Sequence, residues 1–157
     1  MNTTQNISNP DFQVSEKRLT TYSAITGLLV SASFIGFFLV MRALGLEDML
    51  WLRSFNGLFL LAGLFILINH FRERDGKLEY LMGMRIGLRA TAIAMIPFAL
   101  FMFMVLTLNP EFMQYIQSNA WCGQYMNAAS ASGMVLIEGF ASGFMMTYVL
   151  MMIYKRS

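Results

Sequence analysis

The chain has 157 residues, of which 57% are hydrophobic, 14% aromatic and only 13% charged, and its formal net charge is +2. This composition excludes a soluble globular domain and indicates an integral membrane protein, in contact with the lipid bilayer. The charge is too small to favour nucleic acid as a partner. The single cysteine, Cys122, excludes an internal disulfide or a cysteine metal cluster. Because a transmembrane helix needs about 20 apolar residues, the length allows one bundle of a few spans.

The first segment is polar, and we predict a flexible tail over residues 1–19 ahead of a transmembrane domain over residues 20–157. The first apolar run exceeds the core of a secretory signal peptide, about 7 to 15 residues, which predicts a permanent helix. Pro97 is expected to kink the third span. The four spans are predicted at residues 21–41, 51–69, 86–108 and 131–154.

The basic residues divide unequally between the two sides of this arrangement. Only Arg42 and Arg53 fall on one side, and the loop His70–Arg85, with a turn at Asp75-Gly76, contributes much of the charge on the other. By the positive-inside rule, both termini are predicted to be cytoplasmic. The residues on the predicted inner side are Lys17, Arg18, Arg72, Arg74, Lys77, Arg85, Arg89, Lys155 and Arg156.

The connection between the third and fourth spans carries a helix-start signal. Asn109, Pro110 and Glu111 supply an N-cap residue, a proline at the first helical position and an acid in the first turn. Apolar residues from Phe112 to Ile116 then share one face. We predict a short amphipathic helix lying at the outer interface. The alternatives are an ordered loop packed on the bundle, and a lid or docking surface for a partner.

Small residues at helical spacing mark the faces that are expected to touch. In the fourth span Gly139 and Gly143 lie four residues apart, beside a stripe formed by Ala131, Glu138 and Ser142. Four-residue spacing places small residues on one face, where another helix can approach closely. The same prediction of helix packing extends to glycines of two other spans, which are Gly27, Gly36, Gly83 and Gly87.

Glu138 is a carboxylate in an otherwise apolar span. It lies about six residues into the predicted span, roughly 9 Å at 1.5 Å per residue, which predicts a position in the outer leaflet. A carboxylate in hydrocarbon costs several kcal/mol unless it is paired or protonated. We therefore predict an intramembrane polar cluster in which Glu138 ties helices together with Asn56, Arg53, Arg42 and Ser142. The alternative is a proton-coupled or substrate-binding role, although no second intramembrane acid is evident.

Other signals for chemistry are weak. His70, the only histidine, lies at the inner end of the second span and is interpreted as an edge residue; ligation of a haem or pigment is the alternative. Fifteen methionines scatter around the helices, as expected for flexible packing instead of a copper site. The sequence contains no catalytic triad pattern, zinc-binding motif or phosphate loop. We expect no enzyme activity, metal or cofactor.

The segment RERDGKLEYLMGMRIGLRATAIAM resembles the cytoplasmic loop and third helix of uncharacterised small four-helix membrane proteins of Bacteroidetes-type bacteria. The NPEF start of the outer helix and the GFASGFMMTYVLMMIYKR ending are similar to that family as well. The likeness covers roughly residues 20–157. It implies the four-span topology and a bacterial inner (cytoplasmic) membrane, and it implies no activity.

The sequence thus predicts an all-α, four-helix transmembrane bundle with both termini inside and a short interfacial helix between the third and fourth spans. We expect a non-enzymatic membrane or assembly subunit that binds another membrane protein or forms a homo-oligomer. The alternative is a small oligomeric transporter or channel with Glu138 as its titrating group.

Overall fold

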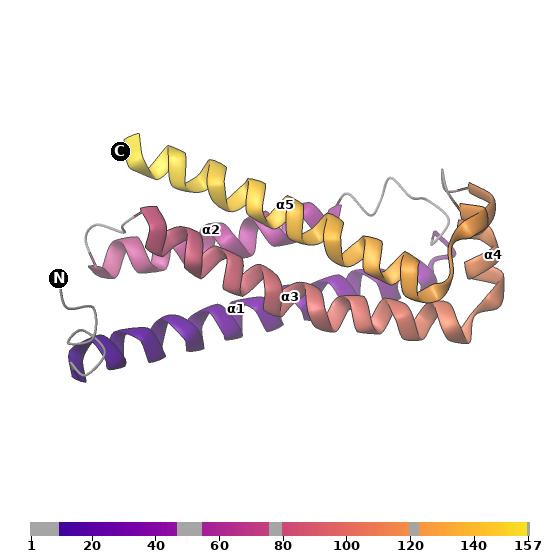
Figure 1. Cartoon of the computed structure of the whole chain (residues 1–157), viewed down its shortest axis with the longest axis horizontal. Helices are drawn as coiled ribbons and strands as arrows, with labels where there is room; N and C mark the ends of the chain where they lie inside the picture. Colours follow the sequence, from indigo (N-terminus) through magenta and orange to yellow (C-terminus); the bar gives the residue numbers. More distant parts are fainter. Residues whose placement is uncertain (1–9, 47–54, 76–79, 120–122, 157) are drawn as a thin grey trace.

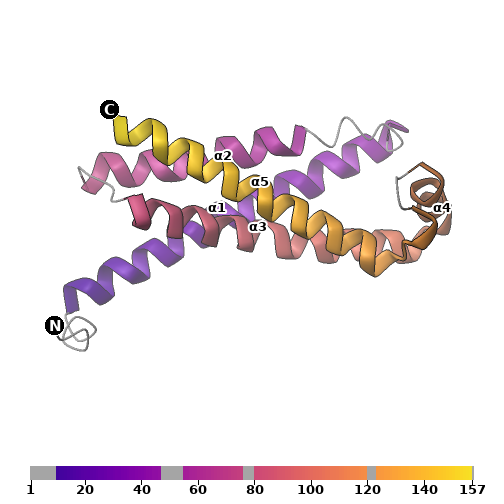
Figure 2. The same ribbon diagram turned by 45° about the horizontal axis from the view of Figure 1, so that its top comes forward.

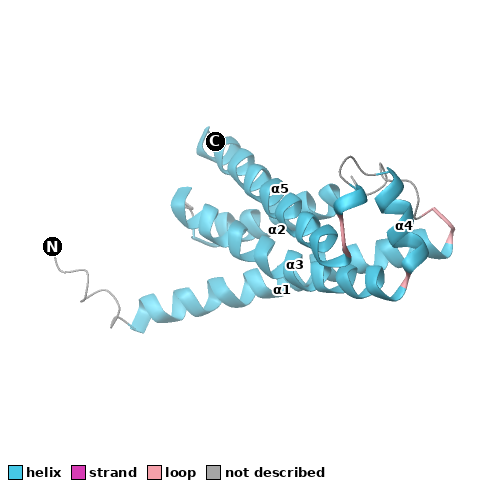
Figure 3. Cartoon of the chain, turned by 45° about the vertical axis from the view of Figure 1, so that its right-hand side comes forward, coloured by secondary structure: helices cyan, strands magenta, loops and turns pink. Residues whose placement is uncertain are grey.

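The computed structural model describes residues 10–46, 55–75, 80–119 and 123–156. Figure 1 shows how the helices are arranged, and Figure 3 shows that no strand occurs in the part of the chain that is described. The elements are α1 (Pro10–Ala43), α2 (Phe55–Asp75), α3 (Tyr80–Leu108), α4 (Pro110–Asn119), a 3₁₀ turn η2 (Gly123–Tyr125) and α5 (Ala128–Arg156).

Four of these helices are long and apolar enough to cross a membrane. Each exceeds or approaches the roughly 20 residues that the hydrocarbon core requires. The all-α fold with four candidate spans and a short helix between the third and fourth is therefore confirmed. The candidate spans are Lys17–Ala43, Phe55–Arg72, Tyr80–Leu108 and Ala128–Tyr154.

The helices extend beyond the apolar runs that predicted them. The helix α1 begins at Pro10, so residues 10–19, which were expected to belong to a flexible tail, are helical. The helix α2 continues to Asp75 and α3 begins at Tyr80, which shortens the expected loop from His70 to Arg85. The predicted turn at Asp75-Gly76 lies partly outside the described residues. Hydrophobicity marks where a helix can sit in lipid, whereas polar residues outside that layer can still continue the helix.

The end of α1 is defined by glycine. The amide of Gly45 donates to the carbonyl of Arg42 (3.1 Å), and the amide of Leu46 donates to that of Met41 (2.9 Å). This pair of bonds is the Schellman motif. Gly45 has a φ of 68°, a left-handed conformation that glycine adopts without steric cost. By contrast, α3 continues through Pro97, which lies inside the helix.

The helix α3 lies at the centre of the bundle, where it packs extensively against both α1 and α5. The helix α2 contacts α1, and its contact with α5 is much smaller. In Figures 1 and 2, the start of α1 and the end of α5 lie at one end of the bundle, and α4 lies across the other. The chain therefore presents its two described ends on one side and its short helix on the opposite side.

Aromatic rings fill the space between α1 and its neighbours. The ring centroids of Phe34 on α1 and Phe98 on α3 are 5.2 Å apart, with the rings at 65°. Nearer α4, Phe38 contacts both Phe101 (5.7 Å) and Phe112 (6.1 Å). Edge-on or tilted contacts at these distances are the favourable geometry for ring pairs. Phe34 is only 1% exposed, so this part of α1 is firmly packed.

The short helix α4 packs onto the bundle end through one face. Met113 and Ile116 are buried against Leu106 of α3 and Ala131 of α5. The opposite face is exposed, and its residues are Glu111, Gln114, Ser118 and Asn119. The helix is therefore amphipathic, as predicted. Its apolar face packs on α3 and α5 at that end of the bundle.

Candidate functional site

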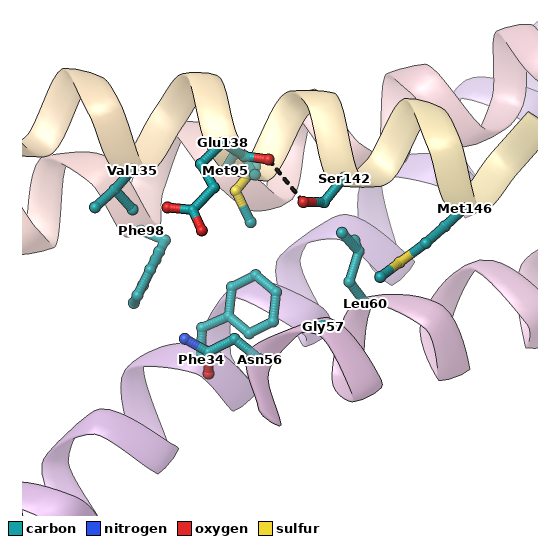
Figure 4. Close-up of a pocket in the computed structure, with 11 residues that line it drawn as sticks. Phe34, Asn56, Gly57, Leu60, Met95, Phe98, Val135, Glu138, Ser142 and Met146 are labelled. Atoms are coloured by element: carbon teal, nitrogen blue, oxygen red, sulfur yellow. Dashed lines mark hydrogen bonds between the residues drawn. The ribbon is translucent and has the colours of Figure 1, made fainter. Parts of the chain in front are cut away.

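The described part of the molecule contains a cleft between α2 and α5, with α1 and α3 forming its floor (Figure 4). Its volume is about 280 Å³, and it is partly open at the side. The polar side chains that line it are Asn56, Glu138 and Ser142. The rest of the lining consists of Phe34, Leu60, Met95, Phe98, Val135 and Met146, with Gly57 and Gly139.

The start of α5 determines how far along this helix Glu138 lies. The amide of Asn127 donates to Oγ of Ser130, and the amide of Ser130 donates to Oδ1 of Asn127, both at 2.8 Å. These reciprocal bonds form a capping box that starts the helix at Ala128, three residues before the predicted start at Ala131. Asn127, which signals this start, was not recognised in the sequence.

The earlier start changes the depth of Glu138. It lies ten residues after Ala128, about 15 Å along the helix at 1.5 Å per residue, instead of the predicted 9 Å. The candidate span runs from Ala128 to Tyr154, and Ala141 is its middle residue. Glu138 is three residues from that midpoint, about 4.5 Å along the axis. Glu138 is thus further from the helix start than predicted, and it lies within the middle third of the span, on the α4 side of the midpoint.

The carboxylate of Glu138 extends from α5 into the cleft, towards the wall that carries Phe34, Asn56 and Phe98 (Figure 4). The side chain counts as exposed, because the cleft is open. The side chain thus faces the other helices of the bundle, but they do not enclose it. Its backbone carbonyl accepts a hydrogen bond from Oγ of Ser142 (2.8 Å). Within the described part of the chain, the carboxylate itself has no hydrogen bond or ion pair.

Asn56 lies across the cleft on α2, as predicted. Its Oδ1 atom is buried and has no hydrogen-bond partner within the described chain. An unpartnered buried polar atom costs about 1 to 3 kcal/mol, so it marks either strain or a missing partner. Asn56 also borders a second, narrower hollow of about 20 Å³ that reaches Phe112 of α4. The cleft and this hollow share Asn56 and Phe98.

Of the two predicted cationic partners of Glu138, Arg42 is bonded elsewhere. Arg42 donates from Nη2 to Oδ1 of Asn109 (2.6 Å), at the joint between α3 and α4. Asn109 in turn donates from Nδ2 to the carbonyl of Val105 (2.8 Å). Arg42 thus bonds to the joint between α3 and α4 and does not pair with Glu138. The prediction that it belongs to the polar cluster is therefore wrong. Arg53 lies outside the described residues.

The side chain of Asn109 does not cap α4, because it is committed to Arg42 and Val105. The backbone carbonyl of Asn109 accepts the first helical bond from the amide of Met113 (3.1 Å). The helix begins at Pro110, with Glu111 in its first turn. The sequence signal for a helix start was thus in the right place, and the capping side chain has a different role.

The helices α3 and α5 meet along a seam of glycine and threonine. A Cβ atom on Gly143 would lie 2.9 Å from Cβ of Thr91, and one on Gly87 would lie 2.6 Å from Oγ1 of Thr147. A Cβ atom on Gly139 would similarly lie 2.9 Å from Cε of Met95. From one pair to the next, the residue number rises by four on α3 and falls by four on α5, which is the pattern of antiparallel packing.

Thr91 and Thr147 were not recognised as part of the seam. Each is fully buried, and each hydroxyl donates to the carbonyl of the glycine four residues earlier. These bonds fix both side chains, so each methyl group rests on a glycine of the other helix. The signal was the spacing Gly-x-x-x-Thr, which occurs at Gly87–Thr91 and again at Gly143–Thr147.

The remaining predicted glycines differ in their surroundings. A Cβ atom on Gly27 would lie 2.7 Å from the carbonyl oxygen of Ala90, so α1 approaches α3 closely there. Gly83 is buried on α3. A Cβ atom on Gly36 would meet nothing within 4 Å of the described chain, and this residue is exposed. Gly36 therefore does not belong to a seam between the described helices, because none of them covers the face of α1 that carries it.

His70 makes ring contacts at the end of the bundle opposite α4. Its ring centroid is 4.9 Å from that of Tyr22 and 5.8 Å from that of Phe71. The ring is exposed. Among the described residues, no group of three or more His, Cys, Asp or Glu side chains could hold a metal ion. His70 thus lies at the edge of the bundle, beside Tyr22 of α1.

The fold and the spans define a multi-pass membrane protein of the four-helix bundle class. Comparison with known protein families, with curated proteins and with solved structures finds no match to this chain. The resemblance to small membrane proteins of Bacteroidetes-type bacteria therefore stays a prediction.

Proposed function

We propose that the protein is a non-enzymatic membrane carrier for cations, with Glu138 as the group that binds them. The observation that carries this proposal is a carboxylate in the middle third of a membrane-spanning helix, facing a cleft, without a hydrogen-bond or ion-pair partner within the described chain. A charge in hydrocarbon is costly, and ionisable residues in such positions commonly mark the pathway of a substrate or an ion. A cation in the cleft supplies the missing partner.

The surroundings of Glu138 support a route through part of the bundle. The cleft and the hollow under Phe112 share Asn56 and Phe98 in their linings. The hollow has room for about one water molecule, because such a site needs roughly 10 to 15 Å³. We propose that the cleft and the hollow form one path, and that movement of α4 or α2 widens it during transport.

The distribution of basic residues supports an orientation. We propose that the shared end of α1 and α5 faces the cytoplasm, and that α4 lies on the outer side. The membrane that we propose is the inner membrane of a bacterium, which rests on the resemblance of the loop and third helix to small bacterial membrane proteins. The carrier is proposed to work as an oligomer, since one bundle of four spans encloses little volume.

A second candidate, a membrane or assembly subunit, is favoured by one observation. Only 22% of the α5 span is buried within the chain, compared with 44% of the α3 span. A partner chain that packs on α5 would then supply a basic residue to Glu138, as paired charges do between membrane helices. A side chain of this partner would occupy the cleft permanently.

The test is a cation flux measured in proteoliposomes. The variant Glu138→Gln keeps the shape of the side chain and removes its charge. We expect it to abolish uptake of a labelled organic cation while the protein inserts and folds as before. The matched control is Glu111→Gln, which changes an exposed acid on α4 and should leave uptake unchanged.

Two results would reject the proposal. One is uptake by the Glu138→Gln variant at the wild-type rate, which would mean that Glu138 does not bind the cation. The other is a wild-type protein that carries no cation but is purified in mild detergent with a stoichiometric second membrane protein, whose loss follows the Glu138→Gln change. This second result would favour the assembly subunit.

A further inference from the structure

We propose that the ligand of the α2–α5 cleft is an organic ammonium ion that carries N–H groups and an apolar body about as large as one aromatic ring. This inference rests on the proposed binding of cations by Glu138 and specifies their chemical class. It is drawn from the groups that line the cleft, from its volume and from its side opening.

The head of the ligand is defined by two acceptors. When it is ionised, the carboxylate of Glu138 accepts hydrogen bonds and donates none. It has no hydrogen-bond partner in the described chain. Oδ1 of Asn56 is also an acceptor without a partner there. It is buried, so we infer that it reaches the ligand by rotation about χ2, which is soft for asparagine. A primary ammonium group offers three N–H donors, which is enough for both acceptors.

The body of the ligand is defined by the apolar walls. Phe34 and Phe98 lie in the wall opposite Glu138 (Figure 4), where they are 1% and 6% exposed, so a ligand meets small apolar parts of both rings. Leu60 and Val135 continue this surface. A ligand that is charged throughout would leave these walls unmatched, whereas a ring or short alkyl chain would bury them.

The volume sets the size. A cavity of about 150 Å³ lined by apolar side chains binds benzene, and the cleft has about 280 Å³. This is room for one ring with a short aminoalkyl chain. A bare divalent ion is a poor match, since it takes six or more oxygen ligands at about 2.0 to 2.6 Å. Only three residues of the lining carry polar side chains.

The opening of the cleft gives the entry path. Gly57 has no side chain to close the gap between α2 and α5, and a Cβ atom there would meet only the tip of Met146, at 3.4 Å. On the described chain, the cleft therefore lies in the gap between α5 and the first turn of α2, which begins at Phe55. We infer that the ligand reaches Glu138 through this gap.

Binding is measured by titration calorimetry on the full chain in mild detergent, with four probes of similar size. The probes are 2-phenylethylammonium, its N,N,N-trimethyl analogue, 2-phenylethanol and 3-phenylpropanoate. We expect 2-phenylethylammonium to bind at least about tenfold more tightly than the alcohol, the range for hydrogen bonds to a charged group. The anion should not bind. The trimethyl analogue should bind more weakly than the primary ammonium, because it has no N–H donor.

Three variants locate the site. Glu138→Gln should remove the preference for the cation over the alcohol. Asn56→Leu should remove the preference for the primary over the trimethylated cation. Gly57→Leu fills the gap and should prevent binding of both cations, while a thermal melt in the same detergent shows whether it is folded. The control Glu111→Gln should bind as the wild type does.

The outcomes separate this inference from the proposed function. Equal binding of the alcohol and the primary ammonium would overturn the inference. If neither organic cation binds but Na⁺ or K⁺ binds in a manner lost in Glu138→Gln, the ligand class is wrong and cation binding by Glu138 stands. If no cation binds through Glu138, both fail.

Discussion

The seam between α3 and α5 allows a sharp prediction about Gly143. Replacing Gly143 by Ala adds one methyl group, which would lie 2.5 Å from Oγ1 and 2.9 Å from Cβ of Thr91. Thr91 cannot give way easily, because it is fully buried and its hydroxyl is bonded to the carbonyl of Gly87. The variant must therefore separate the two helices or force Thr91 from its rotamer.

The magnitude follows from comparison with a second glycine. Gly36 lies in the helix α1, and a Cβ atom there would meet nothing within 4 Å of the described chain. Both Gly→Ala changes gain about 1 kcal/mol of helix propensity, but only Gly143→Ala adds a methyl group to a filled space, at about 1 to 3 kcal/mol. Since the propensity gain cancels, the free energies of unfolding of the two variants should differ by about 1 to 3 kcal/mol, with Gly36→Ala the more stable.

The free energy of unfolding is measured by titrating the protein from a mild detergent into sodium dodecyl sulfate, with helix content followed by circular dichroism. A Thr91→Ser exchange in the Gly143→Ala background removes the threonine methyl group that the alanine would meet. It should recover part of the lost free energy of unfolding. If Gly143→Ala is as stable as Gly36→Ala, the helices do not meet at Thr91 and Gly143, and the seam is misplaced.

The remaining predictions concern helix ends and orientation. Asn127→Ala removes the cap of α5 and should lower the free energy of unfolding by about 0.5 to 2 kcal/mol; an unchanged value in the same titration would mean that α5 starts elsewhere. Gly45→Ala places a side chain in a left-handed conformation and should cost about 1 to 2 kcal/mol, whereas Gly133→Ala, which has open space around it, should cost nothing. A reporter fused after Ser157 should be cytoplasmic and one inserted near Asn119 external, and the reverse pattern would overturn the proposed orientation.

The sequence predicted the spans well because an apolar run of about 20 residues matches the thickness of the hydrocarbon core. It predicted helix ends poorly. The start of α5 depends on the reciprocal bonds of Asn127 and Ser130, and no apolar residue marks that position. The start of α1 at Pro10 lies in a polar segment where helix and tail have similar compositions. Hydrophobicity therefore locates the part of a helix that is in lipid, and local capping locates its end.

The packing glycines were predicted in part, for a related reason. Spacing identified Gly139 and Gly143 as one face of α5, but which helix covers a face is a tertiary property. The pairing with Met95 and Thr91 follows from the antiparallel arrangement of α3 and α5. Gly36 has the same spacing signal as Gly143, but no described helix covers its face.

The candidate site was predicted in outline only. The sequence grouped Glu138 with Asn56, and both line the cleft. It also assigned Arg42 to Glu138, but Arg42 bonds to Asn109. That bond exists because α4 turns back at the end of α3, which is a feature of the fold that charge alone does not reveal. The cleft itself follows from the small contact between α2 and α5, and no sequence pattern encodes it.

The central claim is that a cation occupies the cleft at Glu138, and site-resolved labelling tests it most directly. A hydrocarbon-soluble carbodiimide reacts with carboxyl groups inside the bilayer, and mass spectrometry of the digested protein reports the extent of reaction at each acid. We predict that 2-phenylethylammonium slows labelling of Glu138 in a concentration-dependent manner and leaves any labelling of Glu111 unchanged. Labelling of Glu138 in the folded protein at a rate that neither organic nor inorganic cations alter would contradict the account.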